Sequence, residues 1–82
     1  MNAELTDIKV PSFGQGLDEA LLVEWVAEVG TWVDRGDVVA VAETAKATTE
    51  IVAERDGRVA TLAVAAGTIL TSGQILYQLS AD

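Results

Sequence analysis

The chain lacks cysteine and histidine and has few aromatic side chains. Among its 82 residues there is no Cys and no His, and there are only two Trp, one Tyr and one Phe. The absence of cysteine excludes disulfides and Cys-based zinc sites, and the absence of histidine removes the commonest general base and the commonest metal ligand. We therefore expect no metal site and no catalytic residue. A small domain without a disulfide framework is typical of the cytoplasm.

Basic side chains are also scarce, with five Lys and Arg against 13 Asp and Glu and a net charge of −8. Nothing here would neutralise phosphates, so nucleic acid is excluded as a partner. The polar start MNAELTDIKV is not a signal peptide, and no apolar run is long enough to span a membrane. An acidic surface keeps a domain soluble and can steer it towards basic patches on other proteins. We expect a single monomeric domain over residues 1–82.

What the chain does contain is an internal repeat with an offset of 37 residues. The segment GTWVDRGDVVAVA from Gly30 aligns with GTILTSGQILYQL from Gly67, and the alignment extends back without a gap to Ala20 and Gly57. Two similar halves predict a fold with approximate twofold symmetry. The joint between the halves falls at residues 44–47.

Each half contains short β-branched, apolar stretches separated by turn residues, which is the pattern of an all-β sandwich or flattened barrel. The segment Leu17–Gly30 could instead form an amphipathic helix, with Leu21, Trp25 and Val29 on one face. Its partner in the repeat, RVATLAVAAG, favours a strand, and we follow the repeat. The predicted strands are Ile8–Val10, Leu21–Val26, Val38–Ala42, Thr48–Ala53, Val59–Val64 and Ile75–Leu79.

The joint reads ETAKATTE and places a lysine, Lys46, at the predicted tip of a tight hairpin. Two-residue hairpins usually contain Asn-Gly or Asp-Gly because the turn needs positive φ, so Ala45-Lys46 breaks a local rule. Such violations often mark function. On these residues alone, however, a solvated charge at a hairpin tip is the simpler interpretation.

The segment ETAKATTEI resembles the modification hairpin of lipoyl domains, the carrier domains of the acyltransferase component of 2-oxoacid dehydrogenase complexes. The opening DIKVPSFGQGLDEALLVEW, the segment GRVATLAVAAG and the pair Gly73-Gln74 are also similar to the family, so the resemblance covers Asp7–Leu79. It implies two four-stranded antiparallel sheets related by a pseudo-twofold axis, with the lysine at a hairpin tip. It also implies that residues 1–82, with a core over 7–79, form the N-terminal domain of a longer acyltransferase.

By this resemblance Lys46 carries lipoic acid in amide linkage and acts as a swinging arm. A thiamine-dependent 2-oxoacid decarboxylase would acylate the arm reductively, an acyltransferase domain would pass the acyl group to coenzyme A, and dihydrolipoamide dehydrogenase would reoxidise the arm. A lipoyl ligase would attach it. The family usually has aspartate where Ala45 stands. Recognition around the lysine is assigned to Glu43, Thr44, Ala45 and Ala47.

The glycine-rich loop SFGQGL resembles the family's partner-contact loop for the decarboxylase, although a flexible turn is the plain alternative. Its residues are Ser12, Phe13, Gly14, Gln15, Gly16 and Leu17.

Three other functions share parts of this pattern. Biotin carrier domains usually flank the lysine with methionines, and the only methionine here is Met1. The lipoyl protein of glycine cleavage is larger and has helices for which this chain lacks room. An unmodified lipoyl-like adaptor stays open. The two tryptophans, Trp25 and Trp32, are expected to be packing residues rather than ligand platforms.

Overall fold

The computed structural model describes residues 4–14 and 16–81, and in that part of the chain all regular structure is β-strand. None of the described residues forms a helix of the length and apolarity needed to span a bilayer. The strands are β1 (Leu5–Lys9), β2 (Glu19–Trp25), β3 (Trp32–Val33), β4 (Val38–Glu43), β5 (Thr48–Val52), β6 (Gly57–Leu62), β7 (Ile69–Thr71) and β8 (Ile75–Ser80).

All six predicted stretches overlap strands, with bounds that differ by up to three residues, and the strand interpretation of the segment after Leu17 is confirmed by β2. The short strands β3 and β7 were not among the predicted stretches. Two or three residues are too few for a pattern of alternating apolar side chains to be recognised in a sequence. These strands exist because β6 and β2 offer them pairing partners.

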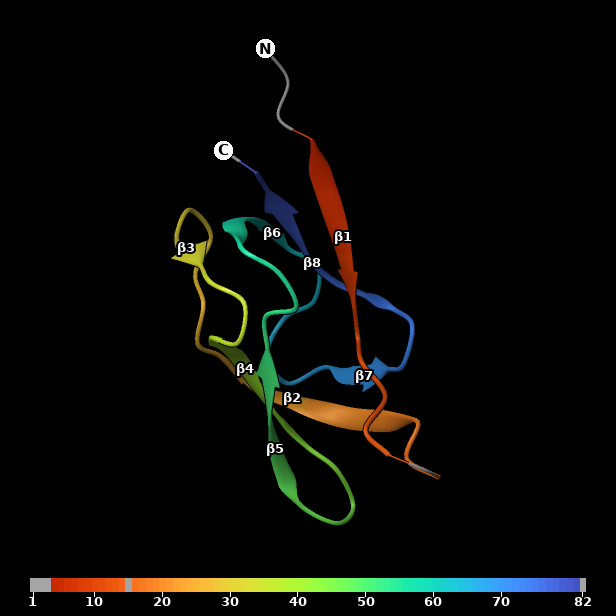
Figure 1. The fold of residues 1–82 in the computed structure, drawn as a ribbon. Helices are drawn as coiled ribbons and strands as arrows, with labels where there is room; N and C mark the ends of the chain where they lie inside the picture. The colour runs from red at the N-terminus through yellow and green to blue at the C-terminus, as the bar shows by residue number, and fades with distance from the viewer. Residues whose placement is uncertain (1–3, 15, 82) are drawn as a thin grey trace.

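The strands form two four-stranded sheets, in the orders β1-β8-β6-β3 and β5-β4-β2-β7, and all pairs are antiparallel. This arrangement confirms the predicted fold class. Figure 1 shows that the β4–β5 hairpin lies at the opposite end of the molecule from the start of β1 and the end of β8.

The core between the sheets is mostly aliphatic, as the composition predicts. Small residues of β4 (Val39, Ala40 and Ala42) and larger ones on β2, β6, β7 and β8 are completely buried. Burial of this apolar surface is the main stabilising contribution to a domain that has no disulfide. The largest completely buried side chains are Tyr77, Leu22, Leu70, Leu76, Val39 and Val59.

The two tryptophans differ. Trp25 is half-buried against the core, donates from its indole N–H to the carbonyl of Val64 at 2.9 Å, and meets Tyr77 edge-to-face at 6.0 Å. The packing prediction is confirmed for Trp25. It is wrong for Trp32, which is 47% exposed and donates its indole N–H to the Asp34 carboxylate at 3.0 Å. The β3 strand places Trp32 on the outside, because the buried alternate position belongs to Val33.

The internal repeat is visible in backbone geometry. Gly30 and Gly67 have φ of 94° and 92°, and Gly36 and Gly73 have φ of 95° and 89°. Only glycine adopts such left-handed conformations without strain, which explains why these positions match in the two halves. The hydrogen bonds agree, since Gly30 N–H donates to Val59 at 2.8 Å and Gly67 N–H donates to Leu22 at 2.7 Å.

The two halves differ in their connections. Nine residues, 10–18, join β1 to β2, whereas four residues, 53–56, join β5 to β6. In addition, Glu43 and Thr48, the last residue pair of the β4–β5 ladder, are connected by a turn. The equivalent pair in the other sheet, Ser80 and Leu5, lies at strand ends that no turn connects. Both departures from symmetry place extra structure at the Lys46 end of the molecule.

Candidate functional site

The joint between the halves is the β4–β5 hairpin, and Lys46 lies at its tip, as predicted. Glu43 and Thr48 form the last strand pair, and Thr44 N–H donates to the Ala47 carbonyl at 2.9 Å. Ala45 and Lys46 therefore form a two-residue tip. No non-glycine residue in the described part of the chain has positive φ, so this tip is not a type I′ turn.

The hydroxyl group of Thr44 explains how Ala-Lys is tolerated in the turn. It donates to the Ala47 carbonyl at 3.0 Å and accepts from the backbone N–H of Ala47 at 3.1 Å and of Lys46 at 3.2 Å. A threonine side chain that satisfies turn amides in this way replaces backbone hydrogen bonds that the turn lacks. Thr44 therefore organises the turn, and its expected part in recognition around the lysine stays a prediction.

Lys46 is presented to solvent between two exposed alanines, Ala45 and Ala47. Its backbone is held by Thr44, and its amine has no hydrogen-bond or ion-pair partner among residues 4–14 and 16–81. The small neighbours leave the amine open to a modifying enzyme. The chemistry available to this site is therefore acylation of the Lys46 amine.

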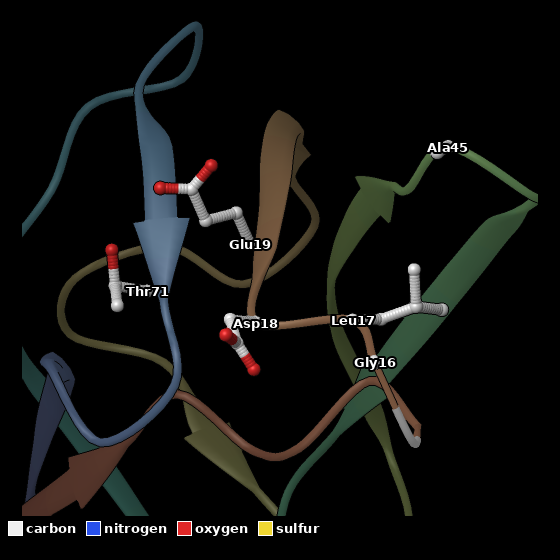
Figure 2. Close-up of a pocket in the computed structure, with 6 residues that line it drawn as sticks. All are labelled: Gly16, Leu17, Asp18, Glu19, Ala45 and Thr71. Atoms are coloured by element: carbon white, nitrogen blue, oxygen red, sulfur yellow. The ribbon is translucent and has the colours of Figure 1, made fainter.

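The loop between β1 and β2 lies beside this hairpin. Gly16 and Leu17 line a cavity of about 430 Å³ together with Ala45, Asp18, Glu19 and Thr71. Figure 2 shows Leu17 on the loop, extending towards the hairpin whose tip carries Ala45.

The first half of the same loop lies alongside β5 in space. Ser12 and Phe13 line a second hollow along that strand, and Phe13 packs against the core. Gly14 closes the loop, with φ of 119° and a carbonyl that accepts from Leu17 N–H at 3.0 Å. Gln15 lies outside the described residues. The structure thus brings the predicted loop to the lysine hairpin, while its role in partner contact stays a prediction.

One titratable group in the described part of the chain has a clearly shifted pKa, and it belongs to the core. Burial, and to a lesser extent the charge of Glu54, raise the pKa of Tyr77 to about 12. Tyr77 is on β8, in the sheet that does not carry the hairpin. Within the described ranges, no group of three or more His, Cys, Asp or Glu side chains could hold a metal.

Two sheets related by a pseudo-twofold axis, with an exposed lysine at the hairpin that joins the halves, define the class of biotin- and lipoyl-attachment domains. Residues 6–79 match the model of the family described as biotin-requiring enzyme. The chain belongs to this family. Membership confirms the prediction of a carrier domain that is not catalytic by itself.

Particular relatives are lipoyl-bearing proteins. The chain is 32% identical to the solution structure of the lipoyl domain of the 2-oxoglutarate dehydrogenase complex from Azotobacter vinelandii, with a TM-score of 0.69 over 89% of this chain and 92% of that one. It is 35% identical over 75 residues to the dihydrolipoyllysine-residue acetyltransferase component of the pyruvate dehydrogenase complex of Bacillus subtilis. It is 37% identical over 75 residues to the lipoamide acyltransferase component of the branched-chain alpha-keto acid dehydrogenase complex of Pseudomonas aeruginosa.

These two alignments cover 92% of this chain but only 17% and 18% of the acyltransferases. The chain therefore spans less than a fifth of the length of these relatives, and nearly the whole of the solved lipoyl domain.

Proposed function

We propose that Lys46 is the attachment site for lipoic acid and that the domain carries acyl groups within a 2-oxoacid dehydrogenase complex. The observation that carries this proposal is the solvent-exposed lysine at the tip of a hairpin that Thr44 holds in place. The likeness to a solved lipoyl domain supports lipoate over biotin. The alanines beside Lys46, in place of methionines, support the same choice.

The residues of the hairpin fit the group. Bound to Lys46, lipoate would supply a dithiolane that accepts an acyl group and passes it on as a thioester. Thr44 fixes the backbone from which the arm extends, and Ala45 and Ala47 leave the amine accessible. Amide formation removes the charge of the lysine and makes this end of the domain more acidic. The chain has no cysteine that could exchange with the dithiolane.

The relatives suggest the partners of such a carrier. They serve pyruvate, branched-chain and 2-oxoglutarate complexes, and we propose the class of substrate that these share, 2-oxoacids. The partners would be a thiamine-dependent decarboxylase, an acyltransferase domain, dihydrolipoamide dehydrogenase and a lipoyl ligase. We further propose that residues 1–82 are the N-terminal carrier domain of a longer acyltransferase and act in the cytoplasm. Tethering would keep the arm at high effective concentration near each active site.

The test is intact-mass measurement after expression with lipoate and a lipoyl ligase. We expect the addition of one lipoyl group, which is lost in Lys46→Ala. The only other lysine is Lys9, so Lys9→Ala is a matched control and should keep the modification. A mass increase of biotin size would move the domain to the carboxylases. No increase in a folded chain would refute the carrier role and favour the unmodified adaptor.

A further inference from the structure

The sheet that carries the lysine hairpin has an outer face with an unusual composition. Residues directly opposite one another on antiparallel strands share a face. Leu21 is opposite both Ile69 and Glu43. One step along the sheet, Val41 is opposite both Glu24 and Glu50. We call this surface the lysine-side face; it consists of Glu19, Leu21, Glu24, Val41, Glu43, Thr48, Glu50, Ile69 and Thr71.

The middle of the lysine-side face is apolar and accessible. Ile69 is 53% exposed and lies opposite Leu21, which is half-buried. Val41, also half-buried, lies diagonally across from Leu21 on β4. Val23, at the bulge of β2 next to Glu24, is 44% exposed. Exposed aliphatic side chains that adjoin one another in this way are a common mark of a protein-binding surface.

Carboxylates surround these apolar residues. All four glutamates of the face are exposed, and none of their carboxylates has a hydrogen-bond or ion-pair partner among the described residues. None of the five basic residues of the chain lies on this face, and Lys46 lies beyond it at the hairpin tip. The four glutamates are Glu19, Glu24, Glu43 and Glu50.

The other sheet shows that the fold does not require this composition. At the positions related by the repeat, Arg58 replaces Leu21 and Trp32 replaces Ile69. Asp7, Thr61 and Gln78 stand where the lysine-side face has Glu50, Glu24 and Val41. This second outer face is mixed in charge, and its Asp7 carboxylate is used in a 2.8 Å hydrogen bond with the amide of Gln78.

We propose that the lysine-side face is the docking surface for the decarboxylase that acylates the arm, and that it contacts an apolar patch ringed by Arg and Lys on that enzyme. The proposal rests on the proposed function. Four unpartnered carboxylates around an apolar centre are complementary to such a patch. Charge repulsion disfavours a second copy of the same face as occupant, because carboxylates would meet carboxylates.

The position of the face suits this role. Leu21 is paired with Glu43, three residues before Lys46, so the apolar centre lies about 10 Å from the tip along the strand. The face and the hairpin belong to one sheet. A partner docked on the face would therefore hold the base of the arm, at Lys46, at a constant distance from its own active site.

The first test neutralises two glutamates. Glu24→Gln/Glu50→Gln raises the net charge by two on the lysine-side face, and Thr61→Lys/Asp7→Asn does the same at the equivalent positions of the other sheet. The lipoylated chains are assayed for kcat/KM of reductive acylation with purified decarboxylases for pyruvate, 2-oxoglutarate and branched-chain 2-oxoacids. We expect a loss of about tenfold for the first variant at low salt, shrinking as salt rises, and a change of less than about twofold for the control.

The second test removes an apolar contact. Ile69→Ser should lower kcat/KM about fivefold with little dependence on salt, whereas Trp32→Ser at the equivalent position should leave it unchanged. Equal losses on both faces, or no loss on either, would overturn the docking proposal. The side chains at 69 and 32 are both about half exposed, so neither change should unfold the domain.

The outcomes for the wild-type chain distinguish a failure of the docking role from a failure of the carrier role. A wild-type chain that takes up no lipoate, or that none of the decarboxylases acylates, refutes the carrier role and the docking role with it. A wild-type chain that is acylated at the same rate as the variants refutes only the docking role. Slower lipoylation of the lysine-side variants would identify the ligase as the occupant, and self-association of the wild type in sedimentation, lost in the variants, would identify a second copy.

Discussion

The two sheets of this domain have nearly the same backbone, but their outer faces differ in charge and composition. Turn glycines, turn hydrogen bonds and strand pairings recur between the two halves. The outer faces do not recur, since one holds four glutamates beside exposed aliphatic residues and the other holds Asp7 on β1, Arg58 on β6 and, opposite Arg58, Trp32. The two halves therefore agree at positions that fix the turns of the backbone or pack in the core. Outward positions, which the fold leaves free, differ according to what each face contacts.

Some equivalent buried positions also differ between the two halves. Ala20 and Gly57 are equivalent and both buried, yet only the second position excludes a methyl group. Ala40 and Tyr77 are also equivalent and buried, so one half supplies an aromatic ring where the other supplies a methyl group. The halves therefore fill one shared core, and neither half is a core by itself.

The largest expected effect tests whether the halves share that core. Leu22 and Val59 are equivalent and almost completely buried. We expect Leu22→Ala to lower the free energy of unfolding by about 3 kcal/mol and Val59→Ala by about 2 kcal/mol, because each leaves a cavity. Urea denaturation measures both. A negligible loss in one variant alone would show that the halves are not energetically alike.

The next prediction concerns the position where the interior halves differ. A Cβ at Gly57 would lie 3.0 Å from Leu79 Cβ and 3.1 Å from the Ser80 carbonyl oxygen. Gly57→Ala should therefore cost about 2 kcal/mol through overpacking. The reverse change at the equivalent position, Ala20→Gly, should cost about 1 kcal/mol through backbone entropy. Thermal unfolding compares the two, and a neutral Gly57→Ala would contradict the close contact.

The equivalent turns at Gly30 and Gly67 should lose the same amount of stability when their glycine is replaced. Gly30 and Gly67 have φ of 94° and 92°, and a Cβ at either would meet nothing within 4 Å. Replacing either with alanine should cost about 1 kcal/mol, since the left-handed conformation is the sole source of strain. Urea titrations of the two variants should agree closely. Clearly unequal losses would break the energetic equivalence of the turns.

The hairpin at the joint has no linked counterpart in the other half, and its turn depends on one hydroxyl. Thr44→Val should cost about 1 kcal/mol and speed hydrogen exchange at the amides of Lys46 and Ala47, which lose their acceptor. Thr44→Ser keeps the hydroxyl and is the matched control. Unchanged exchange in Thr44→Val would show that the backbone alone holds the turn.

The smallest effect is expected at Tyr77, whose hydroxyl is buried without a hydrogen-bond partner among the described residues. Tyr77→Phe should change stability at neutral pH by less than about 1 kcal/mol, because no hydrogen bond is lost.

The same substitution has a pH signature. Burial and Glu54 raise the pKa of Tyr77 from 10.0 to about 12, so the folded state holds this proton more tightly than the unfolded state. The resulting stabilisation is complete below pH 10 and is lost as pH rises through about 12. The phenylalanine variant should lack that decline. Urea denaturation at several alkaline pH values tests this, and parallel curves for both proteins would contradict it.

The sequence alone determined the strand class, the repeat and the position of Lys46. These depend on local features: alternating apolar residues, glycines at turns, and a lysine between two strand patterns. The resemblance of ETAKATTEI to the lipoyl hairpin then suggested the chemistry, and the comparisons support its class.

Features that depend on neighbours from distant parts of the chain could not be predicted and are seen only in the folded domain. The strands β3 and β7 form because β6 and β2 pair with them, and Trp32 is exposed because Val33 takes the buried side of β3. The lysine-side face is assembled from four strands whose order in space differs from their order in the sequence. Cross-strand adjacency is a property of pairing and register, and no local pattern of residues encodes it.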